Sequence, residues 1–445
     1  MPEQPLEPQP ADEGATFDAI IVGAGFAGLY MLYKLRGMGL HARIYEAGGN
    51  VGGTWYWNRY PGARCDAESL AYSYSFSPEL EQEWQWSERY ATQPEILRYI
   101  EHVAQRFDLR KDIRFERRVN KAHYHSASKR WQVATDQGDT ASAPVCIMAT
   151  GCLSVPQLPD IAGLDDFQGA RYQASQWPHE GVDFSGLRVG IIGTGSSAIQ
   201  AIPVIAEQAG HLTVLQRTPN FSVPAFNTPL QDEFVEAFKA NYREHRDYHK
   251  RGLTSGFGDL EVAPRERAMV ESALALSESE LEQLCDSYWN TGGARFMGVT
   301  ADALVDESAN ARIANYVRGK IQQTVNDPAT AKALCPTSYP IGTKRICVDS
   351  NYYDTFNRSN VALVNLQDTP IERITATGVQ TSTQHHEFDA LVLATGFDAM
   401  TGALLRMDIQ GVDGVCLADQ WQAGPVSYLG LMVSGFPNLL SLIHI

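Results

Sequence analysis

A glycine-rich turn occurs twice in this chain, each time directly after a short apolar segment, and this pattern constrains the fold more than any other feature. The first turn, Gly23-Ala24-Gly25-Phe26-Ala27-Gly28, follows residues 17–22 and precedes a helix predicted over residues 27–36. The second, Gly193-Thr194-Gly195-Ser196-Ser197-Ala198, follows residues 187–192. Strand, glycine turn and helix in this order are typical of dinucleotide-binding units. We therefore predict an α/β fold with two Rossmann-like domains.

The first turn has the residues that a pyrophosphate requires. Gly23 permits the tight turn, Gly25 lets backbone N–H groups approach the phosphates, and Gly28 lets the helix pack closely on the strand. Glu46 ends the next predicted strand, residues 41–46, where a carboxylate accepts hydrogen bonds from a ribose. A purely structural glycine turn does not explain this acid, so we predict a dinucleotide site here.

The second turn is followed by a different residue at the deciding position. The strand predicted over residues 212–216 leads into Arg217 and Thr218 rather than into an acid. An arginine binds the 2′-phosphate of NADP(H), whereas a carboxylate would repel it. We therefore predict an NADP(H) site; an ordinary solvated Arg217 is the alternative. The predicted cofactor-binding residues here are Gly193, Thr194, Gly195, Ser196, Ser197, Arg217 and Thr218.

The two turns also organise the rest of the chain. Charged, helix-forming segments fill residues 221–337, and strand patterns return at residues 361–364 and 390–394. Two dinucleotide sites in one chain imply electron transfer between cofactors, one of them a flavin. The predicted organisation is a disordered tail (1–16), an FAD-binding domain (17–155, with a return at 390–445), an NADP-binding domain (156–220 and 338–389) and an all-helical insertion (221–337).

Two longer motifs resemble a known family. They are GGTWYWNRYPGARCD at residues 52–66 and FQGARYQASQWP at residues 167–178. The chain resembles the type I Baeyer-Villiger monooxygenases over residues 17–438, most closely the phenylacetone, steroid and cyclohexanone monooxygenases. The resemblance implies an enzyme that uses FAD and NADPH. It would insert one oxygen atom of O2 next to a ketone carbonyl, through a C4a-peroxyflavin, and release an ester or lactone.

The resemblance also implies roles for individual residues. Arg345 matches the family's catalytic arginine, which stabilises the peroxide and the tetrahedral adduct, and Lys344 would hold the 2′-phosphate together with Arg217. Asp66 matches the aspartate near the flavin that fixes this arginine; a helix N-cap at Asp66 is a compatible alternative. Further flavin contacts are expected from Thr54, Trp55 and Tyr72.

One residue departs from the family pattern. The linker motif has a histidine where this chain has Gln173. Glutamine donates and accepts hydrogen bonds but cannot become an imidazolium. Because the family's histidine influences the reductive half-reaction, this replacement affects the expected coupling to NADPH rather than the expected cofactors.

Charge and cysteine content exclude several other classes. With 36 Lys and Arg against 52 Asp and Glu, the net charge is -16, so nucleic acid and anionic membrane are not expected partners. The seven cysteines include no C-x-x-C pair, which indicates reduced thiols in a cytoplasm and argues against a disulfide reductase. No histidine pair has a third metal ligand, so no metal site is predicted. We expect a monomer or weak homo-oligomer.

Two alternatives stay open at this stage. Flavin monooxygenases that oxygenate nitrogen or sulfur share both glycine turns, but their linker motif lacks the ending Trp177-Pro178 that this chain has. The segment LSLIHI at residues 440–445 reads like a translated adapter from library preparation. From this we expect a truncated reading frame, and an inactive fragment is the third hypothesis.

Overall fold

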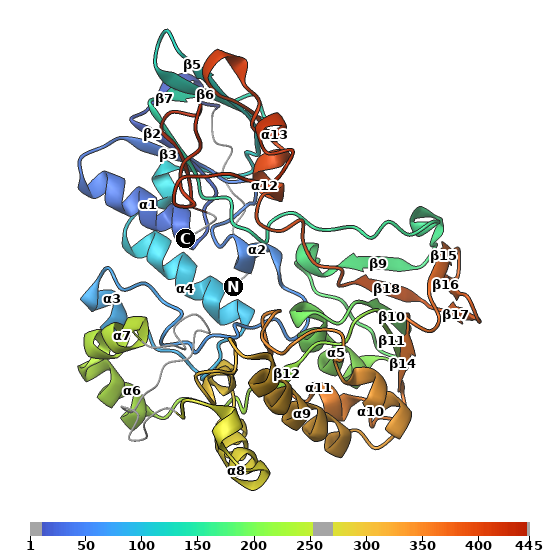
Figure 1. Cartoon of the computed structure of the whole chain (residues 1–445). Coiled ribbons are helices and arrows are strands. Elements are labelled where there is room, and N and C mark those ends of the chain that lie inside the picture. The colour runs from blue at the N-terminus through green and yellow to red at the C-terminus, as the bar shows by residue number, and fades with distance from the viewer. Residues whose placement is uncertain (1–10, 252–269, 443–445) are drawn as a thin grey trace. The chain divides into compact units, whose positions relative to one another are not determined.

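The computed structural model describes residues 11–251 and 270–442, which form two compact units. Within the described residues, unit 1 comprises residues 11–59, 96–158 and 397–442, and unit 2 comprises residues 60–95 and 159–396. Figure 1 shows the elements of both.

Unit 1 is built on a parallel five-stranded sheet of order β20-β8-β2-β3-β4. All four residues of β2 are buried, as expected for a parallel strand covered on both faces. Helix α1 packs against β2 and β3 (Figure 1). The elements of this layer are β2 (Ala19–Val22), α1 (Phe26–Gly37), β3 (Ala42–Tyr45), α2 (Thr54–Trp57), α4 (Gln93–Arg106), β4 (Ile113–Arg114), β8 (Val145–Met148) and β20 (Leu439–Ser441).

A second sheet of unit 1, of order β1-β7-β6-β5-β19, mixes parallel and antiparallel pairs. Its core residue Trp131 is fully buried, stacks on Phe436 and donates its indole N–H to the Pro437 carbonyl at 2.8 Å. The elements are β1 (Glu13–Thr16), β5 (Val119–His125), β6 (Arg130–Thr135), β7 (Thr140–Ala143), α12 (Gly402–Leu405), β19 (Asp408–Gln410) and α13 (Leu417–Gln420).

Unit 2 contains the second parallel sheet, of order β14-β11-β10-β18-β9. Helix α5 starts at the second glycine turn and packs against β11 and the short helix α11 (Figure 1). The elements are β9 (Ala170–Gln173), β10 (Arg188–Ile192), α5 (Ser196–Gln208), β11 (His211–Gln216), α11 (Tyr352–Thr355), β14 (Val361–Asn365) and β18 (Ala390–Leu393).

The remaining elements of unit 2 are mostly helical. The helices are α3 (Pro78–Glu83), α6 (Asp232–Ala240), α7 (Tyr242–Arg251), α8 (Glu278–Trp289), α9 (Glu307–Thr324) and α10 (Pro328–Leu334). An antiparallel sheet is formed by β15 (Ile371–Thr375), β16 (Gly378–Thr381) and β17 (His385–Glu387). The insertion predicted to be all-helical also has one strand: β12 (Ser222–Pro224) pairs in parallel with β13 (Cys347–Asp349).

The expected α/β fold with two Rossmann-like sheets is confirmed, and three boundaries differ from those expected. Residues 13–16, expected within the disordered tail 1–16, form β1 and pair with β7, while residues 1–10 of that tail lie outside the described residues. Strand β18 pairs with both β10 and β9, so the chain returns to unit 1 at residue 397 rather than at residue 390. Residues 60–95 belong to unit 2, because this segment packs on α5 and on the helical part. Within the described residues, no helix combines the length and the apolar character needed to cross a bilayer.

Candidate functional site

The first glycine turn lies between β2 and α1, where packing leaves no room for side chains. Gly23 has φ +103°, and a Cβ there would lie 2.5 Å from the Ala149 carbonyl oxygen. A Cβ at Gly28 would lie 1.9 Å from the carbonyl oxygen of Gly23. Both glycines are therefore required by the close approach of helix, strand and turn. Gly25 differs, since a Cβ there would make only an ordinary 3.5 Å contact with Gly53.

Glu46 holds the same turn in place. Its buried carboxylate accepts hydrogen bonds from the N–H groups of Ala24 at 2.6 Å and Gly48 at 2.7 Å. Burial raises the pKa of Glu46, and these two backbone hydrogen bonds oppose that rise. The acid that the sequence assigns to a ribose thus also organises the backbone of the turn.

The predicted flavin contacts Thr54 and Trp55 begin α2, next to this turn. Gly52 donates its N–H to the Ala24 carbonyl at 3.0 Å, and a Cβ at Gly53 would lie 3.0 Å from the Gly25 Cα. Thr54 is exposed and Trp55 is buried. Tyr72, the third predicted contact, belongs to unit 2, so its contact with a flavin stays a prediction.

Unit 1 has features that fit a dinucleotide. Among the described residues, no side chain caps the start of α1, and its first turn holds no acid, which leaves its N-terminus suited to an anion. The hydroxyl of Thr150 is buried without a hydrogen-bond partner among the described residues, beside the Gly23 turn. Residues 23–28, Glu46 and Thr150 therefore fit the pyrophosphate half of a dinucleotide.

The second glycine turn, in unit 2, has the same local geometry. Gly193 has φ +115°, and a Cβ there would lie 2.3 Å from the Ala394 carbonyl oxygen. A Cβ at Gly195 would meet nothing within 4 Å, so protein packing does not require a glycine there and the space is open to a ligand. Helix α5 also lacks a capping side chain and an acid in its first turn among the described residues.

Polar contacts tie this turn to the end of β11. The Thr194 hydroxyl donates to the Thr218 carbonyl at 2.8 Å, and the Asn220 amide donates to the Thr194 carbonyl at 2.7 Å. Ser196 lies 3.3 Å from the Cys347 sulfur, and Ser197 is hydrogen-bonded to Tyr60. The sequence therefore identified residues that the fold brings together at the carboxyl ends of β10 and β11.

Two exposed cations lie at this end of the sheet. Arg217 directly follows β11, and its side chain is exposed. The Lys344 ammonium lies 4.4 Å from the centre of the Tyr339 ring, and Tyr339 donates its hydroxyl hydrogen to the Pro219 carbonyl at 2.8 Å. Tyr339 thus connects Lys344 with the loop that begins at Arg217.

Asp66 and Arg345 form the ion pair that the resemblance implies. Arg345 Nε lies 3.8 Å from Asp66 Oδ2; the Arg345 side chain is 57% exposed, whereas the Asp66 side chain is 10% exposed. Burial raises the pKa of Asp66 from 3.8 to about 6, and Arg345 and Gln200 oppose the rise. The helix N-cap alternative is wrong, since α2 ends at Trp57 and α3 begins at Pro78, where Ser77 is the cap.

Gln200, on α5, was missed by the sequence analysis. Its amide N–H groups donate to Asp66 Oδ1 at 3.0 Å and to the Arg64 carbonyl at 3.1 Å. Its carbonyl accepts from the Tyr60 hydroxyl at 2.8 Å. The available signal was a polar residue between the buried apolar residues Ile199 and Ala201.

Gln173, the departure from the family motif, ends β9 at the carboxyl edge of the unit 2 sheet. Its side-chain oxygen is buried and has no hydrogen-bond partner among the described residues. The fold thus accommodates a glutamine at this position, and the side-chain oxygen accepts no hydrogen bond from the described residues.

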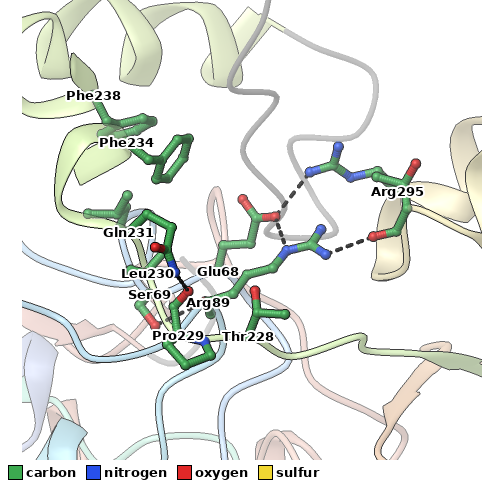
Figure 2. Close-up of a pocket in the computed structure, with 12 residues that line it drawn as sticks. Glu68, Ser69, Arg89, Thr228, Pro229, Leu230, Gln231, Phe234, Phe238 and Arg295 are labelled. Carbon is green, nitrogen blue, oxygen red and sulfur yellow. Dashed lines mark hydrogen bonds and ion pairs between the residues drawn. The ribbon is translucent and has the colours of Figure 1, made fainter. Parts of the chain in front are cut away.

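A cavity of about 280 Å³ lies beside the loop that carries Asp66, and neither Asp66 nor Arg345 lines it. Figure 2 shows the Glu68 carboxylate between two guanidinium groups: Arg89 Nε lies 2.7 Å from Glu68 Oε1, and Arg295 Nη2 lies 3.0 Å from the same oxygen. Phe234 and Phe238 of α6 also line it. This cluster connects the loop to the helical part of unit 2 and has no reacting group of the predicted chemistry.

Comparisons with known proteins agree with these features. Residues 20–247 match the pyridine nucleotide-disulphide oxidoreductase family model. A Baeyer-Villiger monooxygenase of Pseudooceanicola batsensis is 42% identical over 434 residues, which cover 97% of this chain and 78% of that protein. A phenazine N-monooxygenase of Lysobacter antibioticus is 40% identical over 428 residues, covering 95% of this chain and 77% of that protein.

Solved structures extend the likeness to the whole fold. The crystal structure of OTEMO in complex with FAD and NADP superposes with a TM-score of 0.90 at 40% sequence identity. The match covers 96% of this chain and 80% of the solved chain. The likeness therefore spans both units.

Proposed function

The chain belongs to the Baeyer-Villiger monooxygenases, flavin-dependent enzymes that use a nicotinamide cofactor, and we propose that it oxidises a ketone to an ester or lactone with FAD, NADPH and O2. Unit 1 would bind FAD and unit 2 would bind NADP(H). The observation that carries the proposal is the Asp66–Arg345 pair, an exposed guanidinium tethered to a buried carboxylate on the unit that holds the second glycine turn.

The residues around each turn would have distinct tasks. In unit 1, the Gly23–Gly28 turn would hold the FAD pyrophosphate, Glu46 would accept from its ribose, and Thr54 and Trp55 would contact the flavin. When bound, FAD would supply the two-electron and oxygen chemistry that no side chain can provide. The Asp66–Arg345 pair would supply the positive charge that developing oxyanions need.

The cation at position 345 is suited to this task. An arginine stays charged at every working pH, whereas burial lowers the pKa of a lysine. Positive charge held in place before the reaction stabilises an oxyanion without reorganisation. In unit 2, Thr194 and Ser196 would face the NADP(H) phosphates, while Arg217, Thr218 and Lys344 would bind the 2′-phosphate.

We also propose a cellular compartment, substrates and an oligomeric state for the enzyme. All seven cysteines are free thiols, which supports a reducing cytoplasm. The substrates would be a small-molecule ketone and O2, and the enzyme would act as a monomer or weak homo-oligomer.

One assay tests the proposal. The purified protein is examined for flavin absorbance and then given NADPH with phenylacetone or cyclohexanone, and the products are identified by mass spectrometry. We expect a yellow protein and an ester or lactone. Arg345→Ala should abolish the ester and leave flavin reduction by NADPH intact. A colourless protein that does not consume NADPH contradicts the proposal.

A second candidate, N-oxygenation, is favoured by the 40% identity to the phenazine N-monooxygenase. The same assay with phenazine in place of the ketone separates the two. An N-oxide without any ester would assign the chain to nitrogen oxidation.

A further inference from the structure

Gln200 lies on the helix that begins at the second glycine turn. It is the fifth residue of α5, its side chain is 8% exposed, and its neighbours Ile199 and Ala201 are buried apolar residues. A polar side chain so placed is costly unless its hydrogen bonds are satisfied. The contacts that satisfy it define what it does.

The orientation of the Gln200 amide is fixed by the backbone of one residue. The Arg64 N–H, which can only donate, lies 3.3 Å from Gln200 Oε1, and the Arg64 carbonyl, which can only accept, lies 3.1 Å from Nε2. The Tyr60 hydroxyl reinforces this arrangement by donating to Oε1 at 2.8 Å. A flipped amide would lose both hydrogen bonds to the Arg64 backbone.

The fixed amide has one donor left, and it points to Asp66. Gln200 Nε2 donates to Asp66 Oδ1 at 3.0 Å, while Asp66 Oδ2 lies 3.8 Å from Arg345 Nε. The two carboxylate oxygens thus have different partners, and the plane of the carboxylate is set. Tyr60 is also hydrogen-bonded to Ser197 of the second turn, so contacts run from that turn through Tyr60 and Gln200 to Asp66.

We propose that Gln200 is a positioning residue that holds the Asp66 carboxylate toward Arg345 and links this pair to the NADP(H)-binding turn. The inference rests on the proposed function, in which Asp66 and Arg345 act on the reaction. It makes a separate claim about Gln200: the amide donor stabilises the ionised form of Asp66.

Other ionisable groups also face Asp66. Arg345 lowers its pKa, and Asp349, a buried carboxyl at the end of β13, raises it. Cys65, Cys347 and Tyr60 face the same carboxylate, and burial raises the pKa of each of these three groups, so they stay neutral near pH 7. A test of Gln200 must therefore isolate the titration of Asp66 from that of Asp349.

The experiment compares variants of the full chain, each made once with Asp66 in place and once with Asp66→Asn. Gln200→Leu removes the amide, and Gln200→Glu keeps the shape and the acceptors but replaces the donor toward Asp66. Gln208→Ala, at an exposed position on the same helix, is the matched control. The free energy of unfolding is measured in urea from pH 4.5 to 8, with and without Asp66→Asn, so that subtraction gives the apparent pKa of Asp66, including its coupling to Asp349.

Loss of one hydrogen bond to the charged carboxylate should raise the pKa of Asp66 by about one pH unit in Gln200→Leu. Gln200→Glu should raise it at least as far because of the added like charge, and Gln208→Ala should leave it unchanged. With NADPH and phenylacetone, the limb of the kcat profile that reports Asp66 should move by the same amount while KM for the ketone stays constant.

An unchanged pKa of Asp66 in the folded Gln200 variants would overturn the inference. If Gln200→Leu does not fold, Gln200→Met decides, because it also removes the amide donor while keeping an unbranched side chain of similar length, and it should raise the same pKa; no rise there would overturn the inference too. The unfolding measurement needs no turnover, so it still tests Gln200 if the wild-type chain forms no ester.

Discussion

Replacing Asp66 by asparagine should make the protein more stable near neutral pH, and the gain should depend on pH in a way the structure specifies. The pKa of Asp66 is raised by burial from 3.8 to about 6. At pH values between the pKa of the unfolded state and that of the folded state, the folded state binds more protons than the unfolded state. The free energy of unfolding therefore falls as pH rises through this range. Above pH 6, keeping the buried Asp66 carboxylate ionised lowers the free energy of unfolding by about 3 kcal/mol. This figure is roughly two pKa units at about 1.4 kcal/mol each.

Asparagine keeps the shape of the side chain and does not titrate, so Asp66→Asn lacks this pH-dependent cost. The lost ion pair to the exposed Arg345 removes at most about 1 kcal/mol, because such pairs are screened by solvent. Asp349, whose pKa is also raised to about 6 by burial, titrates in both proteins, so their difference retains only its coupling to Asp66. The stability of Asp66→Asn relative to wild type should therefore rise by about 2 kcal/mol between pH 4.5 and pH 8.

The assay is urea unfolding followed by tryptophan fluorescence, with both proteins at the same cofactor occupancy. The difference in unfolding free energy is plotted against pH, and its midpoint reports the pKa of Asp66 in the folded state. A flat difference over the whole range would refute the reasoning, because it would mean that the carboxylate is hydrated or fully compensated in the fold.

Four other substitutions test separate parts of the structure. Gly28→Ala should destabilise the fold by several kcal/mol, since its Cβ would lie 1.9 Å from a carbonyl oxygen, whereas Gly195→Ala should fold normally and weaken NADP+ binding in calorimetry. Glu68→Gln should lower the unfolding free energy by about 3 kcal/mol by leaving two arginines without their carboxylate; thermal unfolding measures this. Gln173→His should speed flavin reduction by NADPH in stopped-flow absorbance, and an unchanged rate would show that the position is neutral.

Local sequence patterns predicted the elements that are determined by residues close together in the chain. The strands before Gly23 and Gly193 and the helix after Gly23 lie within a residue or two of the ranges expected, because a glycine turn between an apolar strand and a helix is specified within about 20 residues. The place of residues 390–393 was not predictable in this way. An apolar strand fits either parallel sheet, and only pairing with β10 and β9 assigns it.

Sequence motifs likewise identified some residues of the candidate site and missed others. Arg217, Lys344 and Arg345 were identified by their place in motifs, and the structure adds the contacts of Lys344 with Tyr339 and of Arg345 with Asp66. Gln200 was not identified, because its role comes from contacts with residues more than 130 positions away, Tyr60 and Asp66. A period of 3.6 residues marks it as a buried position on α5 but does not reveal what it touches.

The contact of Asp66 with Arg345 gives a reason why position 66 holds a charged aspartate rather than an asparagine. An asparagine could accept the same hydrogen bond from Gln200 without the cost of burying a carboxylate. What an aspartate supplies in addition is a negative charge facing Arg345, a largely exposed cation. A buried charge maintained against about 3 kcal/mol is the pattern expected where a functional group must be held in place, since perturbed carboxyls cluster at such sites. The stability measurement on Asp66→Asn and the loss of ester formation in the same variant should therefore go together: more stable, less active.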